Sequence, residues 1–198
     1  MANSPRKERE RAEREQLIVT TARELAEAEG WDAVTTRRLA AKIEYSQPVL
    51  YSHFSGKEAI MAAAALEGFT ELASHLRRAR VATRDVHQAL TRIAEAYFEF
   101  ADEKPALYDA MFTLAIELPF ADPDTPQPMQ DAFAEFFVTV GSLVPESEAG
   151  TYTETFWAAL HGLITLERGR RLPSTHRAAR IAMLVDRFAT PATKEAVR

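Results

Sequence analysis

The sequence predicts an all-helical protein, and three features of the chain carry that prediction. Apolar residues recur every three or four positions through most of the chain, the period of a helix with one buried face. No stretch alternates apolar and polar residues as a half-buried strand does, and neither an internal repeat nor a glycine-rich phosphate loop is found. Hydrophobic residues make up 46% of the 198 residues, enough for a substantial core.

The chain opens with a highly charged stretch and then a long helix. Residues 1–14 carry both charge signs at high density, which is typical of a flexible arm or a frayed helix start. A helix is expected over 15–29, and Gly30 follows where a left-handed C-terminal cap is favoured. The buried stripe of this helix is expected to consist of Leu17, Ile18, Ala22, Leu25 and Ala26.

Two short helices follow, with a turn at Glu44 between them. Thr35 suits the N-cap of the first, whose inward face is Leu39, Ala40 and Ile43. Ser46 suits the N-cap of the second, which tolerates Pro48 in its first turn and ends near Phe54. Two short helices behind a supporting helix form a helix-turn-helix, in which the second short helix lies in the DNA major groove.

The remaining chain is also expected to be helical. Ser55 to Glu58 has the capping-box pattern and opens a long helix. Four prolines mark 119–128 as a surface loop, and Gly169 and Pro173 end a helix of about twenty residues. Apolar stripes predict the other helices around 86–102, 105–112, 133–140, 152–168 and 178–188.

Charge is distributed unevenly along the chain. The net charge of −5 at first argues against a nucleic-acid partner, but residues 59–198, with 14 basic and 19 acidic side chains, account for all of it. Residues 35–57 instead carry a local balance of +3. A basic module on an acidic body is compatible with DNA binding, although ordinary solvated helix faces also carry such charges.

The second short helix presents residue types that suit DNA contact. At 100° per residue, Leu50 and Phe54 face the core, while Val49 lies on the opposite side. The Gln47 amide can bond an adenine edge, and Val49 can touch a thymine methyl. Phosphate contacts are expected from Tyr51, His53 and Lys57, and Thr36 and Arg37 start the first short helix in position for backbone or base contact.

Part of this region resembles the DNA-binding domain of the TetR family. The resemblance lies in the run from Val34 to Ala40, in Gln-Pro-Val-Leu-Tyr-Ser-His-Phe at 47–54, and in Lys57. The resemblance covers about Glu15 to Ile60. It implies a homodimer that binds a palindromic operator and is released by an effector. It also implies that Gln47, Val49 and Tyr51 lie at the DNA. The predicted DNA-binding residues are Thr36, Arg37, Ser46, Gln47, Pro48, Val49, Tyr51, His53 and Lys57.

Glu44 departs from the family pattern, which commonly has glycine in this turn. If Glu44 adopts a left-handed backbone, the strain is about 1–2 kcal/mol. Its carboxylate also discourages close approach of a phosphate.

The second half carries a weaker signal. Trp157, His161 and Gly162 are similar to a Trp…His-Gly signature of one TetR subgroup. In one interpretation, Trp157 fills the core, His161 bonds a backbone group and Gly162 lets a neighbouring helix come close. In the other, Trp157 or His161 belongs to a ligand pocket. The last two helices either form the dimer interface or pack within one subunit. Aromatic stripes are often plain core, but they also line pockets for apolar or aromatic ligands; the candidate pocket residues are Tyr97, Tyr108, Met111, Phe112, Phe137, Trp157 and His161.

Several classes of function are disfavoured. The chain has no cysteine, and its histidines are not spaced as metal ligands are. We therefore expect no enzymatic activity, no bound metal and no cofactor. No apolar run could cross a bilayer and the N-terminus lacks the apolar stretch of a signal peptide, which predicts a cytoplasmic protein without membrane contact. A helical adaptor that binds protein is the alternative to a ligand-responsive repressor. The expected segments are a flexible charged arm (1–14), a helix-turn-helix domain (15–60), a ligand-sensing and dimerisation domain (61–190) and a tail (191–198).

Overall fold

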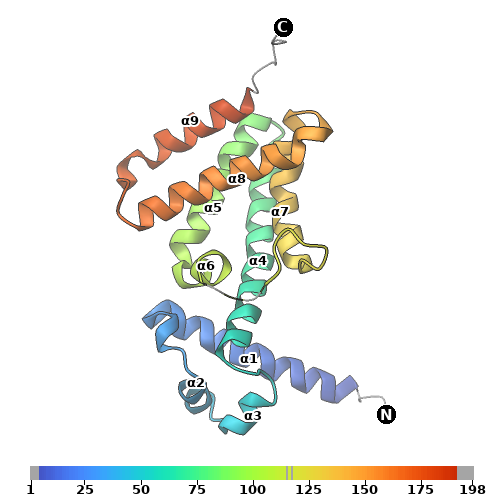
Figure 1. The fold of residues 1–198 in the computed structure, drawn as a ribbon, viewed down its shortest axis with the longest axis vertical. Helices are drawn as coiled ribbons and strands as arrows, with labels where there is room; N and C mark the ends of the chain where they lie inside the picture. The colour runs from blue at the N-terminus through green and yellow to red at the C-terminus, as the bar shows by residue number, and fades with distance from the viewer. Residues whose placement is uncertain (1–4, 115, 117, 191–198) are drawn as a thin grey trace. The chain divides into compact units, whose positions relative to one another are not determined.

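The computed structural model describes residues 5–114, 116 and 118–190, and all regular elements within them are helical (Figure 1). This confirms the predicted fold class. The elements are α1 (Pro5–Glu29), η1 (Trp31–Ala33), α2 (Thr36–Lys42), α3 (Gln47–Tyr51), α4 (Lys57–Val81), α5 (Val86–Glu103), α6 (Pro105–Phe112), α7 (Gln127–Val140), η2 (Gly141–Leu143), α8 (Glu146–Arg168), η3 (Ser174–His176) and α9 (Arg177–Ala189).

The chain divides into two compact units. The first unit consists of the chain up to Phe69 together with Lys104–Pro126, and the second of Thr70–Glu103 together with the chain from Gln127 onward. The helix-turn-helix and α6 therefore belong to one unit, while α5, α7, α8 and α9 form the other. The predicted boundary near residue 60 remains a prediction.

Helix α1 begins earlier than the sequence predicts. Residues 5–14, assigned to a flexible arm, form the first turns of α1, while residues 1–4 lie outside the described residues. Ion pairs one turn apart join Arg6 to Glu10 and Arg11 to Glu15, each at 2.8 Å. Each such exposed pair stabilises a helix by only about 0.3–0.5 kcal/mol. The mixed charge that suggested an arm is therefore arranged at helical spacing.

Smaller differences concern the ends of other elements. Helix α3 ends at Tyr51 instead of Phe54, and α7 begins at Gln127, inside the predicted proline-rich loop. Thr35 caps α2 as predicted, because its hydroxyl accepts a hydrogen bond from the Arg38 amide at 3.2 Å. Ser46 occupies the N-cap position of α3 without a side-chain capping bond. The predicted tail at 191–198 lies outside the described residues.

In the first unit, α6 is held to α1 by buried polar contacts. The Glu27 carboxylate accepts hydrogen bonds from the backbone amides of Ala106 and Leu107, at 3.0 and 2.9 Å. These amides belong to the first turn of α6 and lack partners within the helix. The buried Trp31 indole donates to the Ala106 carbonyl at 2.7 Å. A side chain of α1 thus caps α6, and the indole of η1 fixes the same turn.

Helix α4 approaches α6 at Gly68, also within the first unit. A Cβ atom built on Gly68 would lie 2.6 Å from the Met111 sulfur and 3.1 Å from the Leu107 side chain. Since real Cβ atoms essentially never come within 3.0 Å of another heavy atom, any other residue at position 68 would require the Met111 side chain to shift.

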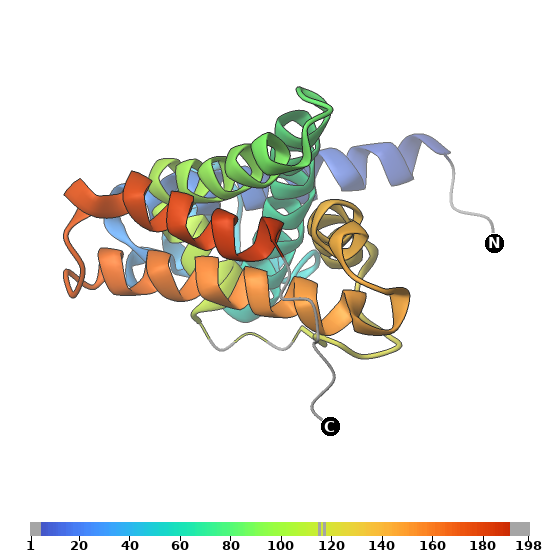
Figure 2. The same cartoon turned by 90° about the horizontal axis from the view of Figure 1, so that it is seen from above.

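The second unit packs α5, α7, α8 and α9 around a buried aromatic core. The Tyr97 and Phe136 rings meet edge-on at 5.5 Å, and the Trp157 indole donates to the Tyr97 hydroxyl at 2.9 Å. The Tyr152 hydroxyl donates to the Phe188 carbonyl at 2.8 Å and joins α8 to α9. Figure 2 shows α8 and α9 running side by side.

Candidate nucleic-acid interface

The turn between α2 and α3 has the geometry of a Schellman motif. The amide of Tyr45 bonds the Ala40 carbonyl at 2.9 Å, and that of Glu44 reaches the Ala41 carbonyl at 3.4 Å. Glu44 itself has φ +58°, in the left-handed region that favours glycine. The conditional expectation from the sequence is therefore met: a non-glycine residue occupies this position, at a cost of about 1–2 kcal/mol.

Helix α3 buries one side and exposes the predicted contact residues. Leu50 is completely buried and anchors the helix. On the two flanks of Leu50, Val49 is 38% and Tyr51 is 51% exposed. The remaining exposed positions at the start of α3 are Ser46, Gln47 and Pro48. The helix thus presents a ridge of mixed amide, aliphatic and phenol groups to solvent.

Thr36 and Tyr51 join the start of α2 to α3. Their hydroxyl oxygens lie 3.3 Å apart, and either can donate the hydrogen bond. Arg37, next to Thr36, is exposed. The structure therefore brings Thr36 and Tyr51 together from two helices, with Arg37 exposed in the position that follows Thr36.

His53 takes a different position from the one expected of a phosphate ligand. Its side chain is only 7% exposed, and its Nδ1 atom lies 3.3 Å from the Glu15 carboxylate on α1. The hydrogen bond from Arg11 and then the one from His53 hold the pKa of Glu15 below its ordinary value, against the effect of burial. This geometry favours a role in fixing the motif to α1.

The basic residues of the motif separate into two kinds. Arg38 forms a two-pronged ion pair with Glu29, at 2.9 and 2.8 Å, and Lys42 lies 3.7 Å from Glu24. The hydrogen bonds from Arg38 lower the pKa of Glu29. Within the described parts of the chain, Arg37 and Lys57 form no such pair. The local excess of +3 counted in the sequence therefore reduces to two available cations, because α1 supplies acids to the other two.

The structure assigns the seven predicted pocket residues to both units. Tyr108, Met111 and Phe112 are on α6 in the first unit, where Phe112 packs 4.9 Å from Tyr108 and 5.2 Å from Phe69 between ring centroids. Tyr97, Trp157 and His161 are in the second unit with Phe137. The Trp157 and His161 rings are 6.3 Å apart.

The surroundings of the second-unit residues differ. Burial, and secondarily the charge of Arg168, lowers the pKa of His161, so the imidazole is neutral at neutral pH. Phe137 is 40% exposed on α7.

Neither a metal site nor a membrane span emerges in the regions that the structure covers. Among residues 5–114, 116 and 118–190, no three histidine, aspartate or glutamate side chains gather as a metal would require. None of the helices in these regions combines the length and hydropathy needed to cross a bilayer.

Two family models match the chain. Residues 18–64 match the bacterial regulatory proteins of the tetR family, and residues 90–188 match the tetracyclin repressor-like C-terminal domain. The first match spans α2, the turn and α3, so the ridge described above lies inside it.

The chain is also similar to named regulators. It is 35% identical over 96 residues to the uncharacterized HTH-type transcriptional regulator YobS of Bacillus subtilis, a match spanning 48% of this chain and only 50% of that protein. It is 30% identical over 151 residues to the uncharacterized HTH-type transcriptional regulator Rv0681 of Mycobacterium tuberculosis, covering 76% of this chain and 68% of that one.

A solved structure of a protein of unknown function from Rhodococcus sp. RHA1 shares the fold. It superposes with a TM-score of 0.70 over 88% of this chain and 93% of its own, at 22% sequence identity. At this identity the likeness establishes the architecture alone.

Proposed function

The chain belongs to the TetR family of transcriptional regulators, which are not enzymes, and on that premise we propose that it is a homodimeric repressor that a small apolar or aromatic effector releases from a palindromic operator. The observation that carries the proposal is the exposed ridge of α3 above the buried Leu50. Exposed apolar and phenol groups beside the Gln47 amide suit contact with base edges and phosphates in a DNA groove.

DNA reading is assigned to the start of α3. Gln47 bonds an adenine edge and Val49 packs against a thymine methyl, while Tyr51 bonds a phosphate. The contact with Thr36 supports this role for Tyr51, because it restrains the phenol before DNA arrives. Arg37 and Lys57 supply phosphate contacts, and Ser46 and Pro48 flank the reading residues. His53 contributes indirectly, by holding the motif against α1 through Glu15.

Dimerisation is assigned to α8 and α9. Met183 is 68% exposed, and Leu166 is also largely exposed. Ala179 and Ala182 lie exposed on α9 near Met183, so a facing helix can approach closely. In the dimer, two copies of α3 lie about 34–36 Å apart in successive major grooves.

Effector response is assigned to the aromatic clusters, with α6 as the link to the DNA-binding motif. Tyr108, Met111 and Phe112 lie on the same helix whose first turn is held by Glu27 and Trp31. A ligand that displaces α6 therefore pulls directly on α1. A tenfold loss of operator affinity requires about 1.4 kcal/mol of such coupling. The Trp157 and His161 pair, characteristic of the Trp…His-Gly subgroup, lines the effector side of the second unit in this proposal.

A double substitution tests the DNA-binding assignment. Tyr51→Ala with Lys57→Ala removes two phosphate contacts, so operator affinity should fall by more than tenfold and the salt dependence should flatten by about two counterions. Arg92→Ala, which removes an exposed cation on α5, is the matched control and should leave affinity unchanged. Sedimentation should show an unaltered dimer for both variants.

Unchanged operator binding in the double variant would contradict the assignment of α3 to DNA reading. If the double variant bound operator as tightly as the unsubstituted protein while the dimer persisted, α3 would not be the reading helix, and the protein-binding adaptor would gain support. A reporter gene behind the operator then gives the sign of regulation: deleting the regulator raises expression if it represses and lowers it if it activates.

A further inference from the structure

One side of α1 changes its chemistry along the helix. Positions 7, 11, 14, 18, 21 and 25 follow one another at intervals of three or four residues, so they lie on the same side. In the C-terminal half this side is buried, at Ile18, Thr21 and Leu25. In the N-terminal half the same side is exposed and consists of cations. This basic stripe is formed by Lys7, Arg11 and Arg14.

The basic stripe lies on a part of α1 that other elements leave uncovered. Every residue from 5 to 14 except Glu10 is exposed, and Figure 1 shows these turns projecting past α2 and α3. Within the described chain, the hydrogen bond from α1 to another element that lies nearest its N-terminus joins Glu15 to His53, two positions after α3. The stripe therefore starts beside the C-terminal end of α3 and continues away from it.

Two of the three cations in the stripe are available to a partner. Arg11 is paired one turn along its own helix, whereas Lys7 and Arg14 make no ion pair with the residues that the structure describes. Glu10, an acid that flanks the stripe, is already bonded by Arg6. The stripe thus holds positive charge that the helix itself does not neutralise.

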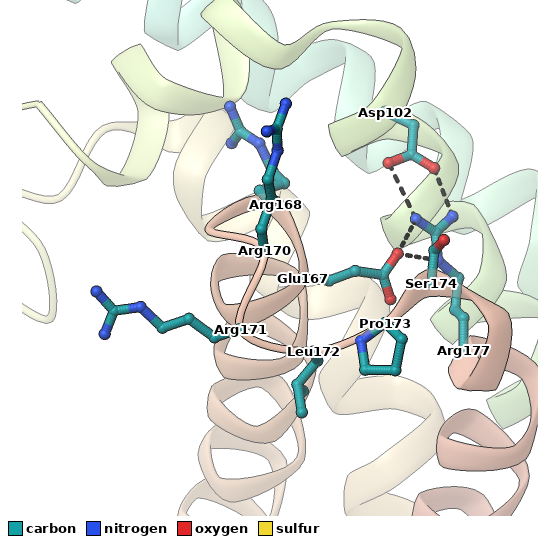
Figure 3. Close-up of a pocket in the computed structure, with 9 residues that line it drawn as sticks. All are labelled: Asp102, Glu167, Arg168, Arg170, Arg171, Leu172, Pro173, Ser174 and Arg177. Carbon is teal, nitrogen blue, oxygen red and sulfur yellow. Dashed lines mark hydrogen bonds and ion pairs between the residues drawn. The ribbon is translucent and has the colours of Figure 1, made fainter.

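The cations where α8 meets α9 are used differently. Arg177 bonds Asp102 of α5 and Glu167 of α8, and so ties three helices of the second unit together (Figure 3). Arg180 bonds the same glutamate. These arginines are neutralised by the fold that they stabilise, whereas the two available cations of the stripe contribute nothing to the packing of their unit.

We propose that the basic stripe binds phosphates of the DNA next to the bases that α3 reads, with Lys7 and Arg14 as the ligands. Ammonium and guanidinium groups bind phosphate oxygens whatever the sequence. The seven positions from Lys7 to Arg14 amount to about 10 Å of helix axis, which matches about three base pairs of duplex. This inference rests on the proposed function, because the stripe has DNA beside it only if α3 binds an operator.

Salt titration and hydroxyl-radical footprinting of the full chain on its operator test the proposal. Lys7→Gln with Arg14→Gln should lower affinity about tenfold and make the slope of log K against log salt shallower by about two per protomer. The same variant should lose protected sugars next to each half-site. Since glutamine has nearly the helix propensity of lysine and arginine, its melting temperature should not change.

A second double variant is the matched control. Arg6→Gln with Arg9→Gln removes two exposed cations from the other side of the same turns. It should bind the operator and protect it as the unsubstituted protein does. If the Lys7 and Arg14 variant behaves like this control, the proposal is overturned. Equal weakening by both double variants also overturns it, because the charge would then act without a defined contact.

Gln47→Ala separates a failure of the stripe from a failure of the proposed function. If Gln47→Ala loses sequence preference while the Lys7 and Arg14 variant binds normally, α3 is the reading helix and the stripe alone is overturned. If the unsubstituted protein shows no sequence preference at all, the proposed function fails, and the inference about the stripe fails with it.

Discussion

The helix-turn-helix and the core of the second unit place an aromatic residue in opposite ways. In the helix-turn-helix, Tyr51 stands half exposed above the buried Leu50, whereas in the second unit Tyr97 and Phe156 are completely buried. An exposed ring contributes little to folding and is available to a partner, while a buried ring stabilises the fold and is hidden. The comparison teaches that burial separates residues that read a partner from residues that maintain the fold, even where both are aromatic.

The largest effect expected is at the core of the second unit. Phe156 is fully buried and lies 5.0 Å from Phe188 and 6.5 Å from Phe136 between ring centroids. Phe156→Ala should lower the free energy of unfolding by about 3–5 kcal/mol. Tyr51→Ala should lower it by less than about 0.5 kcal/mol while weakening operator binding. Urea unfolding of both variants measures the contrast, and equal losses of stability would break it.

The next effect concerns the polar contact between α1 and α6. Glu27→Ala removes the acceptor of two part-buried amides of α6 and should cost about 0.5–1.5 kcal/mol. Glu27→Gln keeps one acceptor oxygen and should recover part of the loss. Thermal unfolding compares the three proteins. A Glu27→Ala variant as stable as the unsubstituted chain would mean that the first turn of α6 does not depend on α1.

Relief of the left-handed turn should stabilise the first unit. Glu44→Gly removes the strain at φ +58°, and the added chain entropy of glycine offsets part of it, leaving a gain of about 0.5–1 kcal/mol. Glu44→Ala, which keeps a Cβ atom, is the control and should give no gain. The urea midpoint is the measurement, and a loss of stability for glycine would contradict the strain assigned to this turn.

The smallest effect is a pH dependence at His161. Burial lowers its pKa in the folded protein below the ordinary value of 6.5, so below pH 6.5 the unfolded chain binds more protons than the folded one. The stability contributed by the neutral imidazole is therefore complete above pH 6.5 and is lost as pH falls through the folded-state pKa. His161→Gln should flatten the unfolding curve in this range. A loss of stability below pH 6.5 that is as large in His161→Gln as in the unsubstituted protein would contradict this assignment.

Local signals predicted much of the fold because their causes lie within a few residues. The cap at Thr35 and the proline that opens α6 act on adjacent backbone, and these two helices begin where the sequence predicts. The exposure of α3 followed from helical periodicity in the same way. Since these causes are short-ranged, a single sequence contains them in full.

Long-range pairing explains what the sequence did not predict. The partner of His53 is Glu15, 38 positions away, and that of Arg38 is Glu29, on a different helix. The sequence separations of these two pairs match no helical or strand period, so a search for periodicity does not find them. The acidic residues on α1 did indicate that some cations of the motif are neutralised. The pocket residues were grouped by residue type alone, and type does not determine which unit a side chain joins.

The central claim is that the ridge on α3 reads an operator. A titration of the purified protein against DNA upstream of its own gene, at several salt concentrations, tests it most directly. We expect tight, sequence-dependent binding whose affinity falls steeply with salt, together with a loss of sequence preference in Gln47→Ala. Weak binding of equal strength to every sequence, unchanged in Gln47→Ala, would contradict it.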